Sequence, residues 1–469
     1  MNILAAVDNV IRLKKDTVPQ GLVDEIRDEL TVENPAYHQM KMLQYRQPQK
    51  YQYVKMPPAT ITSYDEAGNT MYLPRGFKDD LSKLVAAHGC AIDWRDATVV
   101  FDRDYEITLS EDITLKDYQR RGLGSMVMNG SGVLIAPCGG GKTVTGIGIL
   151  STLKQPTLIL VHTNDLLTQW LSELGSKACL PFQPGQWGGG KKDLQKVTVA
   201  TIQTLIRAKP EELRELLGKF GCVILDEAHP CPADTFMGVM NMSPSRYRFG
   251  LTATPERKDG LEELMYRVIG PVRAEITDSD LVAEGRSQLC EVVQVETGFY
   301  TRYAADEWTK LLGELVKDGD RNRLIVDRVV EDWRDGQFPL VLSDRVGHCR
   351  QLQQMLRQHG MNAQLLVGEV NRKQRESIVN HSKDGLVDAI IATKVADEGL
   401  DIPNLSSIHL VSPTANKAKT QQRIGRIRRP IPGKRSVVFD YVDARVPSLA
   451  RMAKQRRTLY KRWGFAFAD

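Results

Sequence analysis

The stretch GVLIAPCGGGKT, residues 132–143, decides the fold class of the central part of this chain. Its apolar start predicts a buried strand, its glycines predict a tight loop, and VTGIGILSTL, residues 144–153, predicts a helix. In this arrangement small residues let successive backbone N–H groups surround a phosphate at the helix N-terminus. Ala136 stands where the pattern G-x-x-x-x-G-K-[ST] has its first glycine. The pattern predicts that Lys142 reaches the β- and γ-phosphates of a nucleotide and that the Thr143 hydroxyl holds Mg²⁺.

An acidic pair follows in CVILDEAH, residues 222–229, where Asp226 lies 84 residues after Lys142. Four apolar residues place Asp226 at the carboxyl end of a predicted strand, which is the edge where α/β sheets bind ligands. A carboxylate there can hold Mg²⁺ through water, and Glu227 can polarise the attacking water. His229 is a candidate for coupling the nucleotide site to the next loop, although a lone histidine is more often structural.

Short apolar runs alternate with amphipathic stretches in two series, which predicts buried parallel strands flanked by helices. The first series is GVLIA, PTLILV, KVTVA, CVILDEA and YRFGLTA, and the second is FPLVLS, NAQLLVG, AIIATKV, SIHLV and SVVFDYV. We therefore expect two α/β domains in tandem behind a small mixed α+β domain. The expected boundaries are 1–110 for the N-terminal domain, 111–275 for the first α/β domain, 276–334 for a linker or hinge, and 335–469 for the second α/β domain.

Positive charge is concentrated near the end of the chain. The chain has 469 residues and a net charge of +5. Its last part, residues 416–469, contains 15 Lys and Arg and 3 Asp and Glu, a net charge of +12, so the rest of the chain has a net charge of −7. A polyanionic partner such as nucleic acid is the simplest implication. The seven cysteines form no C-x-x-C pair, and no apolar run approaches the roughly 18 residues of a membrane span. These features predict a soluble protein of a reducing cytoplasm, without a membrane partner.

The two ends of the chain carry less information. ATITSYDEAGNTMYLPRG, residues 59–76, predicts two short strands around a turn, and ATVVFD, residues 97–102, predicts another strand. The N-terminal domain is either an accessory DNA-binding domain or a structural cap on the first α/β domain. A basic amphipathic helix is expected between Pro447 and Gly464. The aromatic residues at its end either form a wedge or pack against the second domain: Trp463, Phe465 and Phe467.

Further motifs carry a resemblance to a known family. DEAH is followed by LTATP (251–255), ATKVADEGLDIP (392–403) and QRIGRIRR (422–429), and it is preceded by LKDYQ (115–119). This series resembles the superfamily 2 helicases and translocases. GGGKKDLQKVTVATIQTL and LTATPERKDGLEELMYRVIGP resemble the XPB-like branch, including phage UvsW-like DNA helicases. The resemblance covers residues 112–430 and implies two tandem RecA-like domains with ATP bound between them.

The resemblance also implies roles for individual residues around ATP. Gln119 would read adenine, and Asp401 would approach the ribose or phosphates. Gln422, Arg426 and Arg429 would come from the second domain, where an arginine fork can stabilise charge on the γ-phosphate. Thr252 and Thr254 would couple hydrolysis to the nucleic-acid strand. The loop around the phosphates would consist of Pro137, Cys138, Gly139, Gly140, Gly141, Lys142 and Thr143.

Other motif positions imply contacts with the nucleic-acid backbone, because short hydroxyl and amide side chains suit phosphates and sugars. A purely structural role in a turn is the alternative for each of them. Arg423 and Arg428 would pair locally or touch the strand. The residues implied as backbone contacts are Thr163, Asn164, Thr201, Ser343, Arg345, Thr393 and Lys394.

These features lead to one principal hypothesis and two alternatives. The principal hypothesis is an ATP- and Mg²⁺-dependent DNA helicase or translocase of a prokaryotic or phage-infected cytoplasm. It would track along a single strand from 3′ to 5′ and remodel forked or branched DNA in replication, recombination or repair. The first alternative is an RNA helicase with the same core. The second is an ATP-driven motor subunit of a restriction or recombination complex, which needs a protein partner.

Overall fold

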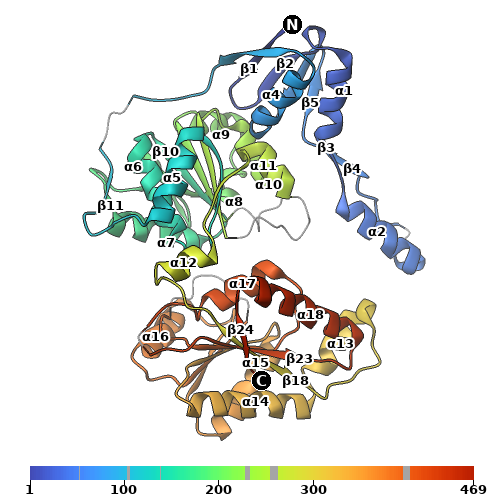
Figure 1. The fold of residues 1–469 in the computed structure, drawn as a ribbon, viewed down its shortest axis with the longest axis vertical. Coiled ribbons are helices and arrows are strands. Elements are labelled where there is room, and N and C mark those ends of the chain that lie inside the picture. Colours follow the sequence, from blue (N-terminus) through green and yellow to red (C-terminus); the bar gives the residue numbers. More distant parts are fainter. Residues whose placement is uncertain are drawn as a thin grey trace. The chain divides into compact units, whose positions relative to one another are not determined.

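The computed structural model of the protein describes residues 1–51, 53–102, 106–137, 139–227, 233–253, 262–393, 402–431 and 433–468. It divides into two compact units, one formed by residues 1–136 and 141–276 and the other by 137–140 and 277–469. The first unit contains the N-terminal domain and one parallel sheet, and the second contains another parallel sheet (Figure 1). No helix in these described ranges is long and apolar enough to cross a membrane.

The N-terminal domain is built on a mixed five-stranded sheet in the order β5-β6-β2-β1-β7. Ile3, Ala5, Leu13 and Leu73 alternate on the buried face of the sheet, and α1 and α4 supply Leu22, Ile26 and Leu81 to the same core. A separate two-stranded ribbon, β3–β4, carries helices α2 and α3. The elements are β1 (Asn2–Val7), β2 (Ile11–Lys14), η1 (Lys15–Thr17), α1 (Gln20–Glu29), β3 (Thr31–Glu33), α2 (Pro35–Arg46), α3 (Pro48–Tyr51), β4 (Thr60–Thr62), β5 (Asp65–Ala67), β6 (Thr70–Leu73), η2 (Arg75–Phe77), α4 (Lys78–Ala87) and β7 (Ala91–Asp96).

The strand expected at residues 97–102 is not formed. Val99 makes only an isolated bridge to Ser245, and its backbone exchanges hydrogen bonds with Pro244 and Arg246. Phe101 instead exchanges backbone hydrogen bonds with the side-chain amide of Gln155, at 2.8 Å each. The apolar run ATVVFD is therefore a connection held to the following domain at Val99 and Phe101.

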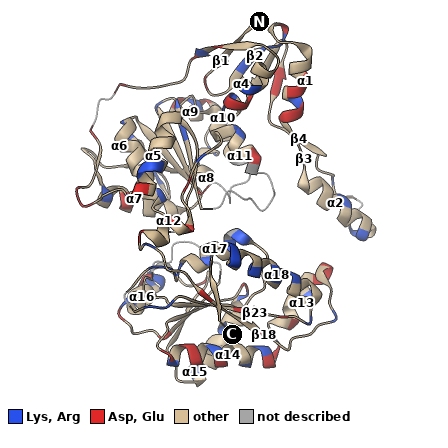
Figure 2. Ribbon diagram, in the orientation of Figure 1, with Lys and Arg blue, Asp and Glu red and all other residues tan. Residues whose placement is uncertain are grey.

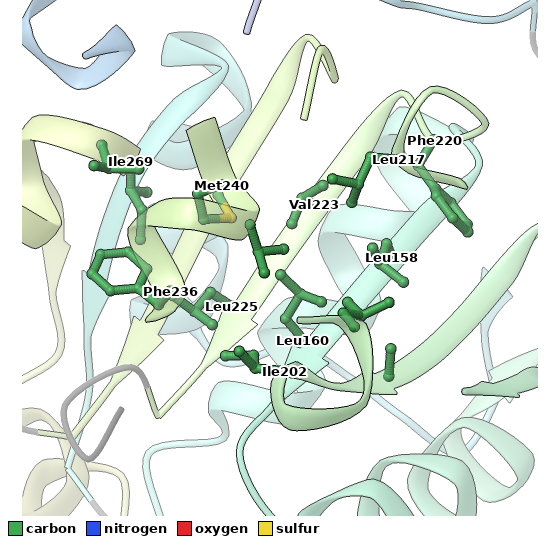
Figure 3. Packing of buried hydrophobic residues seen from close by; sticks show 14 of the residues in the cluster. Leu158, Leu160, Ile202, Leu217, Phe220, Val223, Leu225, Phe236, Met240 and Ile269 are labelled. Atoms are coloured by element: carbon green, nitrogen blue, oxygen red, sulfur yellow. The ribbon is translucent and has the colours of Figure 1, made fainter. Parts of the chain in front are cut away.

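The first parallel sheet has eight strands in the order β13-β12-β14-β10-β15-β16-β9-β17. All neighbours pair in parallel except β12 and β13. Leu158, Leu160, Val223 and Leu225 of the central strands pack under helices α8 to α11 (Figure 3). The elements are β8 (Thr108–Leu109), α5 (Asp117–Asn129), β9 (Ser131–Ile135), α6 (Lys142–Leu153), β10 (Thr157–Val161), α7 (Asn164–Lys177), β11 (Ala178–Cys179), β12 (Gly185–Gly188), β13 (Lys191–Asp193), β14 (Val197–Thr201), α8 (Ile202–Leu205), α9 (Pro210–Leu217), β15 (Cys222–Asp226), α10 (Ala233–Met242), β16 (Tyr247–Thr252), α11 (Glu262–Ile269) and β17 (Val272–Glu275).

The second sheet has seven strands, all paired in parallel, in the order β20-β21-β19-β22-β23-β18-β24. The expected alternation of strands and helices is therefore confirmed in both units. The elements are α12 (Asp278–Ala283), β18 (Glu291–Glu296), η3 (Ala305–Glu307), α13 (Trp308–Leu315), α14 (Gly319–Arg334), β19 (Pro339–Leu342), α15 (Val346–Gln358), β20 (Ala363–Leu366), α16 (Arg372–Lys383), β21 (Ala389–Ala392), β22 (Ser407–Leu410), α17 (Lys417–Gly425), β23 (Val437–Val442), α18 (Pro447–Arg462) and β24 (Ala466–Ala468).

The expectation that residues 276–334 form a linker requires correction. Strand β18 pairs with both β23 and β24, and α14 packs its valines into the core of the second sheet. EVVQVE, residues 291–296, alternates like a half-buried strand, but its partner β23 lies more than 140 residues away. The sequence of this segment therefore predicts a strand, but it does not predict the pairing with β23 that makes the segment part of the second domain.

The end of the chain is packed against the second sheet. Arg456 of α18 is buried and donates to both carboxylate oxygens of Asp440 on β23 at 2.7 to 3.1 Å. Tyr460 and Phe465 are buried, and the half-buried Trp463 and Phe467 pack against the same core. The packing alternative for the C-terminal aromatic residues is therefore the one that the structure shows.

The N-terminal domain docks on the first parallel sheet through two arginines, the half-buried Arg75 and the buried Arg248. Arg75 donates to the carbonyl oxygens of Ser245 at 2.5 Å and Arg246 at 2.7 Å, and Arg248 of β16 donates to the carbonyl oxygen of Asn9 at 2.9 Å. Burial lowers the pKa of Arg75 to about 10, so its guanidinium is still charged at neutral pH. A buried charge needs acceptors, and here backbone carbonyls supply them. The two domains therefore form one body.

The tightest point of this docking is Gly76. A Cβ atom at this position would lie 2.1 Å from the carbonyl oxygen of Tyr266 and 2.6 Å from that of Arg267, both on α11. These distances are far inside van der Waals contact, and the obstructing atoms belong to a helix backbone. Only glycine lets η2 approach α11 this closely.

We expect Gly76→Ala to destabilise the first unit by about 1–3 kcal/mol, because overpacking at a rigid contact forces the backbones apart. The midpoint of urea unfolding, followed by circular dichroism, measures the effect. Gly21→Ala is the matched control, since no atom lies within 4 Å of a Cβ at Gly21 on α1. An equal change in both variants would contradict the role given to Gly76.

Candidate active site

The phosphate loop connects β9 to α6 as predicted. The backbone N–H of Ala136 donates to the carbonyl oxygen of Thr252 at 2.9 Å, so the neighbouring strand β16 holds the start of the loop. Gly139 and Gly141 have φ angles of +83° and +74°, which favour glycine. Lys142 is the first residue of α6. The loop therefore has the turn and the helix N-terminus that phosphate binding requires.

Gln119 lies against this loop. Its side-chain oxygen accepts a hydrogen bond from the backbone N–H of Lys116 at 2.9 Å, at the start of α5. Its side-chain nitrogen lies 2.1 Å from the position that a Cβ of residue 141 would occupy. Gly141 is therefore required twice, by its φ angle and by the Gln119 amide. The predicted adenine-reading residue therefore lies beside Gly141, the residue at which the phosphate loop meets α6, within the first unit.

Lys142 and Glu227 meet at the carboxyl edge of the sheet. Lys142 Nζ lies 3.1 Å from Glu227 Oε1 and donates to the carbonyl oxygen of Ala136 at 3.2 Å. Glu227 has a φ angle of +50°, an unusual conformation for a residue other than glycine. Its backbone N–H donates to the carbonyl oxygen of Leu251 on β16 at 2.9 Å. Strained backbone conformations of this kind are common at functional sites. In this conformation the side chain of Glu227 contacts Lys142 at the end of the phosphate loop.

Asp226 is the last residue of β15 and is 5% exposed. Burial, and then the negative charge of Glu227, raises its pKa, while Lys142 and a hydrogen bond from Trp170 act in the opposite direction. Its Oδ2 atom accepts that hydrogen bond at 2.7 Å. Its Oδ1 atom is buried without a hydrogen-bond partner among the described residues. A carboxylate oxygen so placed is costly unless a cation or water satisfies it.

These observations fit Mg²⁺ held by Asp226 and Thr143 together with nucleotide phosphates. Magnesium sites of this class use one or two protein oxygens, and the remaining ligands are phosphate oxygens and water. No cluster of three or more His, Cys, Asp and Glu suited to a metal occurs in the part of the chain that the structure describes. The structure thus brings Lys142, Asp226 and Glu227 together beside the loop that carries Thr143.

Trp170 is a site residue that the sequence reasoning did not single out. It lies on α7, is buried, and its ring packs against Gly146 of α6, where a Cβ would come within 2.7 Å of the indole. The helical spacing of Leu167, Trp170 and Leu174 indicated a core position, and a buried indole N–H needs an acceptor. That the acceptor is Asp226 follows only from the parallel packing of β10 and β15.

Helix α7, which carries Trp170, begins at two residues that are predicted to contact nucleic acid. Thr163 caps α7, its hydroxyl accepting from the backbone N–H of Leu166 at 3.2 Å, and Asn164 is exposed in the first turn. Two turns later, Trp170 holds Asp226. Helix α7 is therefore a direct physical connection between a candidate strand contact and the acidic pair.

Other predicted contacts have their hydroxyls engaged inside the protein. Thr201 is buried, and its hydroxyl lies 2.7 Å from that of Thr204. Ser343 is fully buried, and its hydroxyl lies 3.0 Å from His348 Nδ1. These two side chains help to shape turns at strand ends, and their contact with nucleic acid stays a prediction. Thr393 is also buried.

The arginine run in the second unit separates into two kinds of residue. Arg423 is buried and donates to Asp344 Oδ1 at 2.9 Å, and Lys419 donates to the same oxygen at 2.7 Å. Burial opposes ionisation of Asp344, but these two cations outweigh it and lower its pKa. Arg428 is buried in an ion pair with Asp278 and donates to the carbonyl oxygen of Gln288 at 3.0 Å. Both arginines pair locally.

The remaining members of the run are more accessible. Gln422 on α17 and Arg426 at its end are half-buried, and Arg429 is exposed. Outside the run, the predicted nucleic-acid contact Arg345, which precedes α15, is also exposed. Buried and accessible residues alternate along α17 because one side of this helix faces Asp344 and the core of the second unit. Five predicted site residues lie outside the described residues: Cys138, His229, Thr254, Lys394 and Asp401.

We expect Trp170→Phe to lower the ATP turnover number about tenfold, because a lost hydrogen bond from a supporting residue leaves the metal-binding carboxylate less well placed. The KM for ATP should change much less, since the phosphate loop is intact. The Mg²⁺ concentration for half-maximal hydrolysis should rise. Steady-state assays over a Mg²⁺ series measure all three quantities.

Trp333→Phe is the matched control for this prediction. Trp333 Nε1 donates to Asp388 Oδ1 at 3.2 Å in the second unit, so the same kind of bond is removed elsewhere. Wild-type turnover and Mg²⁺ dependence in Trp170→Phe would show that its hydrogen bond does not position Asp226.

Two sequence families match the chain. The family described as "Type III restriction enzyme, res subunit" matches residues 111–257, and the family described as "Helicase conserved C-terminal domain" matches residues 320–430. The first range contains the phosphate loop and the acidic pair, and the second contains the arginine run. The two ranges together cover more than half of the chain.

Individual proteins agree with these family matches. "DNA 3'-5' helicase XPB" of Mycobacterium tuberculosis is 29% identical over 368 residues, which cover 75% of this chain and 65% of that protein. The match therefore spans slightly less than two thirds of this relative. S. cerevisiae Dbp5 bound to RNA and ADP BeF3 shares the fold over 75% of this chain and 89% of its own, with a TM-score of 0.54 at 16% identity.

The crystal structure of T4 UvsW aligns with 100% of this chain and 99% of its own, with a TM-score of 0.45 and 17% identity. The predicted fold of two RecA-like domains is confirmed by the two parallel sheets and by the shared fold of Dbp5. With its motifs in the predicted order on these sheets, the chain is similar to the XPB-like branch of the superfamily 2 helicases.

Proposed function

We propose that the protein is an ATP-dependent DNA helicase or translocase that moves from 3′ to 5′ and remodels forked or branched DNA in replication, recombination or repair. The observation that carries this proposal is the assembly of Lys142, Asp226 and Glu227 around the phosphate loop of an XPB-like chain. The name of the mycobacterial relative supports DNA and the polarity. The proposed setting is the cytoplasm of a prokaryotic or phage-infected cell.

The chain's own residues supply the steps of hydrolysis. Backbone N–H groups of the loop and Lys142 bind the phosphates of ATP, and Glu227 accepts a proton from the attacking water. Mg²⁺, held by Thr143 and Asp226, would neutralise charge on the phosphate oxygens. Gln422, Arg426 and Arg429 complete the machinery, as the sequence resemblance implies.

A second candidate is a motor subunit that needs a protein partner. It is favoured by one observation, the match of residues 111–257 to the "res subunit" family of restriction enzymes. Such a subunit would hydrolyse ATP on DNA but unwind little by itself. Strand separation by the purified protein therefore distinguishes the two candidates.

We expect DNA to stimulate ATP hydrolysis, with forked and four-way junctions stimulating more than linear duplex and more than matched RNA. We expect Lys142→Ala to abolish both hydrolysis and strand separation, because the phosphates lose their principal cation. Lys219→Ala, at a half-exposed side chain of the same unit, is the matched control and should retain both activities.

The outcomes of this panel separate the hypotheses. Stimulation by RNA alone would reject a DNA enzyme in favour of an RNA helicase. Stimulation by DNA without strand separation or branch migration would favour the partner-dependent motor subunit. Retained unwinding in Lys142→Ala would reject the proposed site.

We expect Arg426→Lys and Arg429→Lys to lower DNA-stimulated ATP turnover by about 10³-fold, the lower end of the effect of arginine fingers in related phosphoryl transfer. Lysine retains the charge but cannot form the planar fork. ATP affinity, measured with a fluorescent analogue, should change far less than turnover. Arg435→Lys, at an exposed side chain of the second unit, should leave turnover unchanged.

A further inference from the structure

The N-terminal domain carries an arm, defined here as residues 34–59, between the strands β3 and β4. The arm contains helices α2 and α3 and leads away from the five-stranded sheet of its domain (Figure 1). Its base is closed by Asn34, which donates from its backbone N–H to the carbonyl oxygen of Ala59 at 2.9 Å and from its side chain to that of Pro58 at 2.8 Å. The arm is therefore an insertion with a fixed base.

The arm has almost no hydrophobic core. Every residue of α2, all of which the structure describes, is exposed or half-buried. The side-chain amide of Gln44 donates to the carbonyl oxygen of Tyr51 at 3.2 Å, which folds α3 back toward α2. Ordering a segment costs conformational entropy that burial normally offsets. The side chains of α2 are therefore available to a binding partner.

The charge of the arm differs from that of the domain around it. Residues 34–59 contain Lys41, Arg46, Lys50 and Lys55 and no Asp or Glu, a net charge of +4. Residues 1–33 carry −3 and residues 60–96 carry −2. Figure 2 shows basic residues and no acidic ones along α2, whereas α1 is rich in acidic residues. The positive charge is therefore confined to the insertion.

Four tyrosines are interleaved with these cations. Tyr45 is 89% exposed and Tyr53 is 91% exposed, and both are outliers for aromatic residues. Lys41 lies 5.8 Å from the ring centre of Tyr37, and Lys50 lies 5.3 Å from that of Tyr51. The arm thus presents open aromatic faces beside cations.

We propose that the arm is a second nucleic-acid site, which binds an unpaired DNA strand by stacking bases on Tyr45 and Tyr53 while its lysines and Arg46 contact the phosphates. Nonspecific single-strand binding uses this combination of aromatic platforms and positive charge. An unpaired strand is favoured over duplex because the bases of a duplex are already stacked on one another. The absence of acidic residues from the arm favours a polyanion over a protein partner of mixed charge.

The proposal extends the proposed function, since a forked or branched DNA offers an unpaired strand beside the one that the motor follows. It does not depend on ATP hydrolysis. DNA binding is measured without nucleotide, both in the wild-type chain and in the Lys142→Ala background. Failure of the motor and failure of the arm are therefore distinguishable.

The test is fluorescence anisotropy of the full chain with a labelled single strand, a blunt duplex and a fork. We expect Tyr45→Ala with Tyr53→Ala to weaken binding of the single strand and the fork by about tenfold or more, and binding of the duplex by less than threefold. Tyr45→Phe with Tyr53→Phe should bind like wild type, because the rings remain. Tyr300→Ala is the control, at a tyrosine of the second unit that is 68% exposed.

The charges are tested separately through salt. Lys41→Gln with Lys50→Gln should reduce the slope of log affinity against log salt on the single strand by about 1.4, the value for two phosphate contacts. Lys83→Gln with Lys310→Gln, at side chains 77% and 64% exposed, should leave the slope unchanged. Thermal midpoints should match wild type in all variants, since the arm is outside the hydrophobic cores.

Three results would overturn the proposal. The first is wild-type affinity for the single strand and the fork in the double tyrosine-to-alanine variant. The second is an equal loss in the phenylalanine variant, which would exclude stacking. The third is unchanged DNA binding together with a changed sedimentation coefficient in the alanine variant, which would make the arm a contact between copies of this chain.

Discussion

The parallel register of β9, β16 and β15 is the constraint on which the candidate site depends. Ile135 pairs with Thr252, and Leu251 with Asp226, so three strands end at the same level. The phosphate loop, the acidic pair and the carbonyl groups that hold both of them therefore meet at one edge. A shift of register in either pairing would separate Lys142 from Glu227, which are 85 positions apart in the chain.

Two helices contact the site residues at this edge of the sheet. Helix α5 presses Gln119 against Gly141, and α7 brings the indole of Trp170 to Asp226. Both contacts occur where a glycine leaves room, at Gly141 for the amide and at Gly146 for the ring. The phosphate-loop helix is thus held from two sides by side chains whose polar atoms also belong to the site.

Arginine serves two physical purposes in this molecule. Arg75 and Arg248 join the N-terminal domain to the first sheet through backbone carbonyls, and Arg423, Arg428 and Arg456 bind carboxylates within the second unit. Arg75 is half-buried and the other four are buried, and each of the five has an internal acceptor or anion. An arginine that stabilises charge on a phosphate must be accessible to that phosphate. Arg429 is exposed and Arg426 is half-buried, so both meet this requirement.

The N-terminal domain consists of a docked sheet and a separate arm, and only the arm is proposed to bind DNA. Its sheet is fixed to the first RecA-like domain by Arg75, Arg248 and the close approach at Gly76, as expected of a structural cap. The arm takes no part in this docking and carries the positive charge that the rest of the domain lacks. A strand bound by the arm, as proposed, would be held by a base that is fixed to the first RecA-like domain.

Much of this protein was determined by the sequence alone. Every apolar run that was expected to be a strand of the two parallel sheets does form one, because such runs reflect local burial. The motifs likewise identified Lys142, Asp226 and Glu227, because loop chemistry is written in short stretches of sequence. The strand β18, the false strand at 97–102, the partner of Trp170 and the burial of Ser343 and Thr201 depended on neighbours remote in the chain. The difference between Arg423 and Arg426 likewise depended on which side of α17 faces Asp344. Only tertiary structure decided these points, because pairing and burial are properties of contacts between segments, which one segment's composition does not contain.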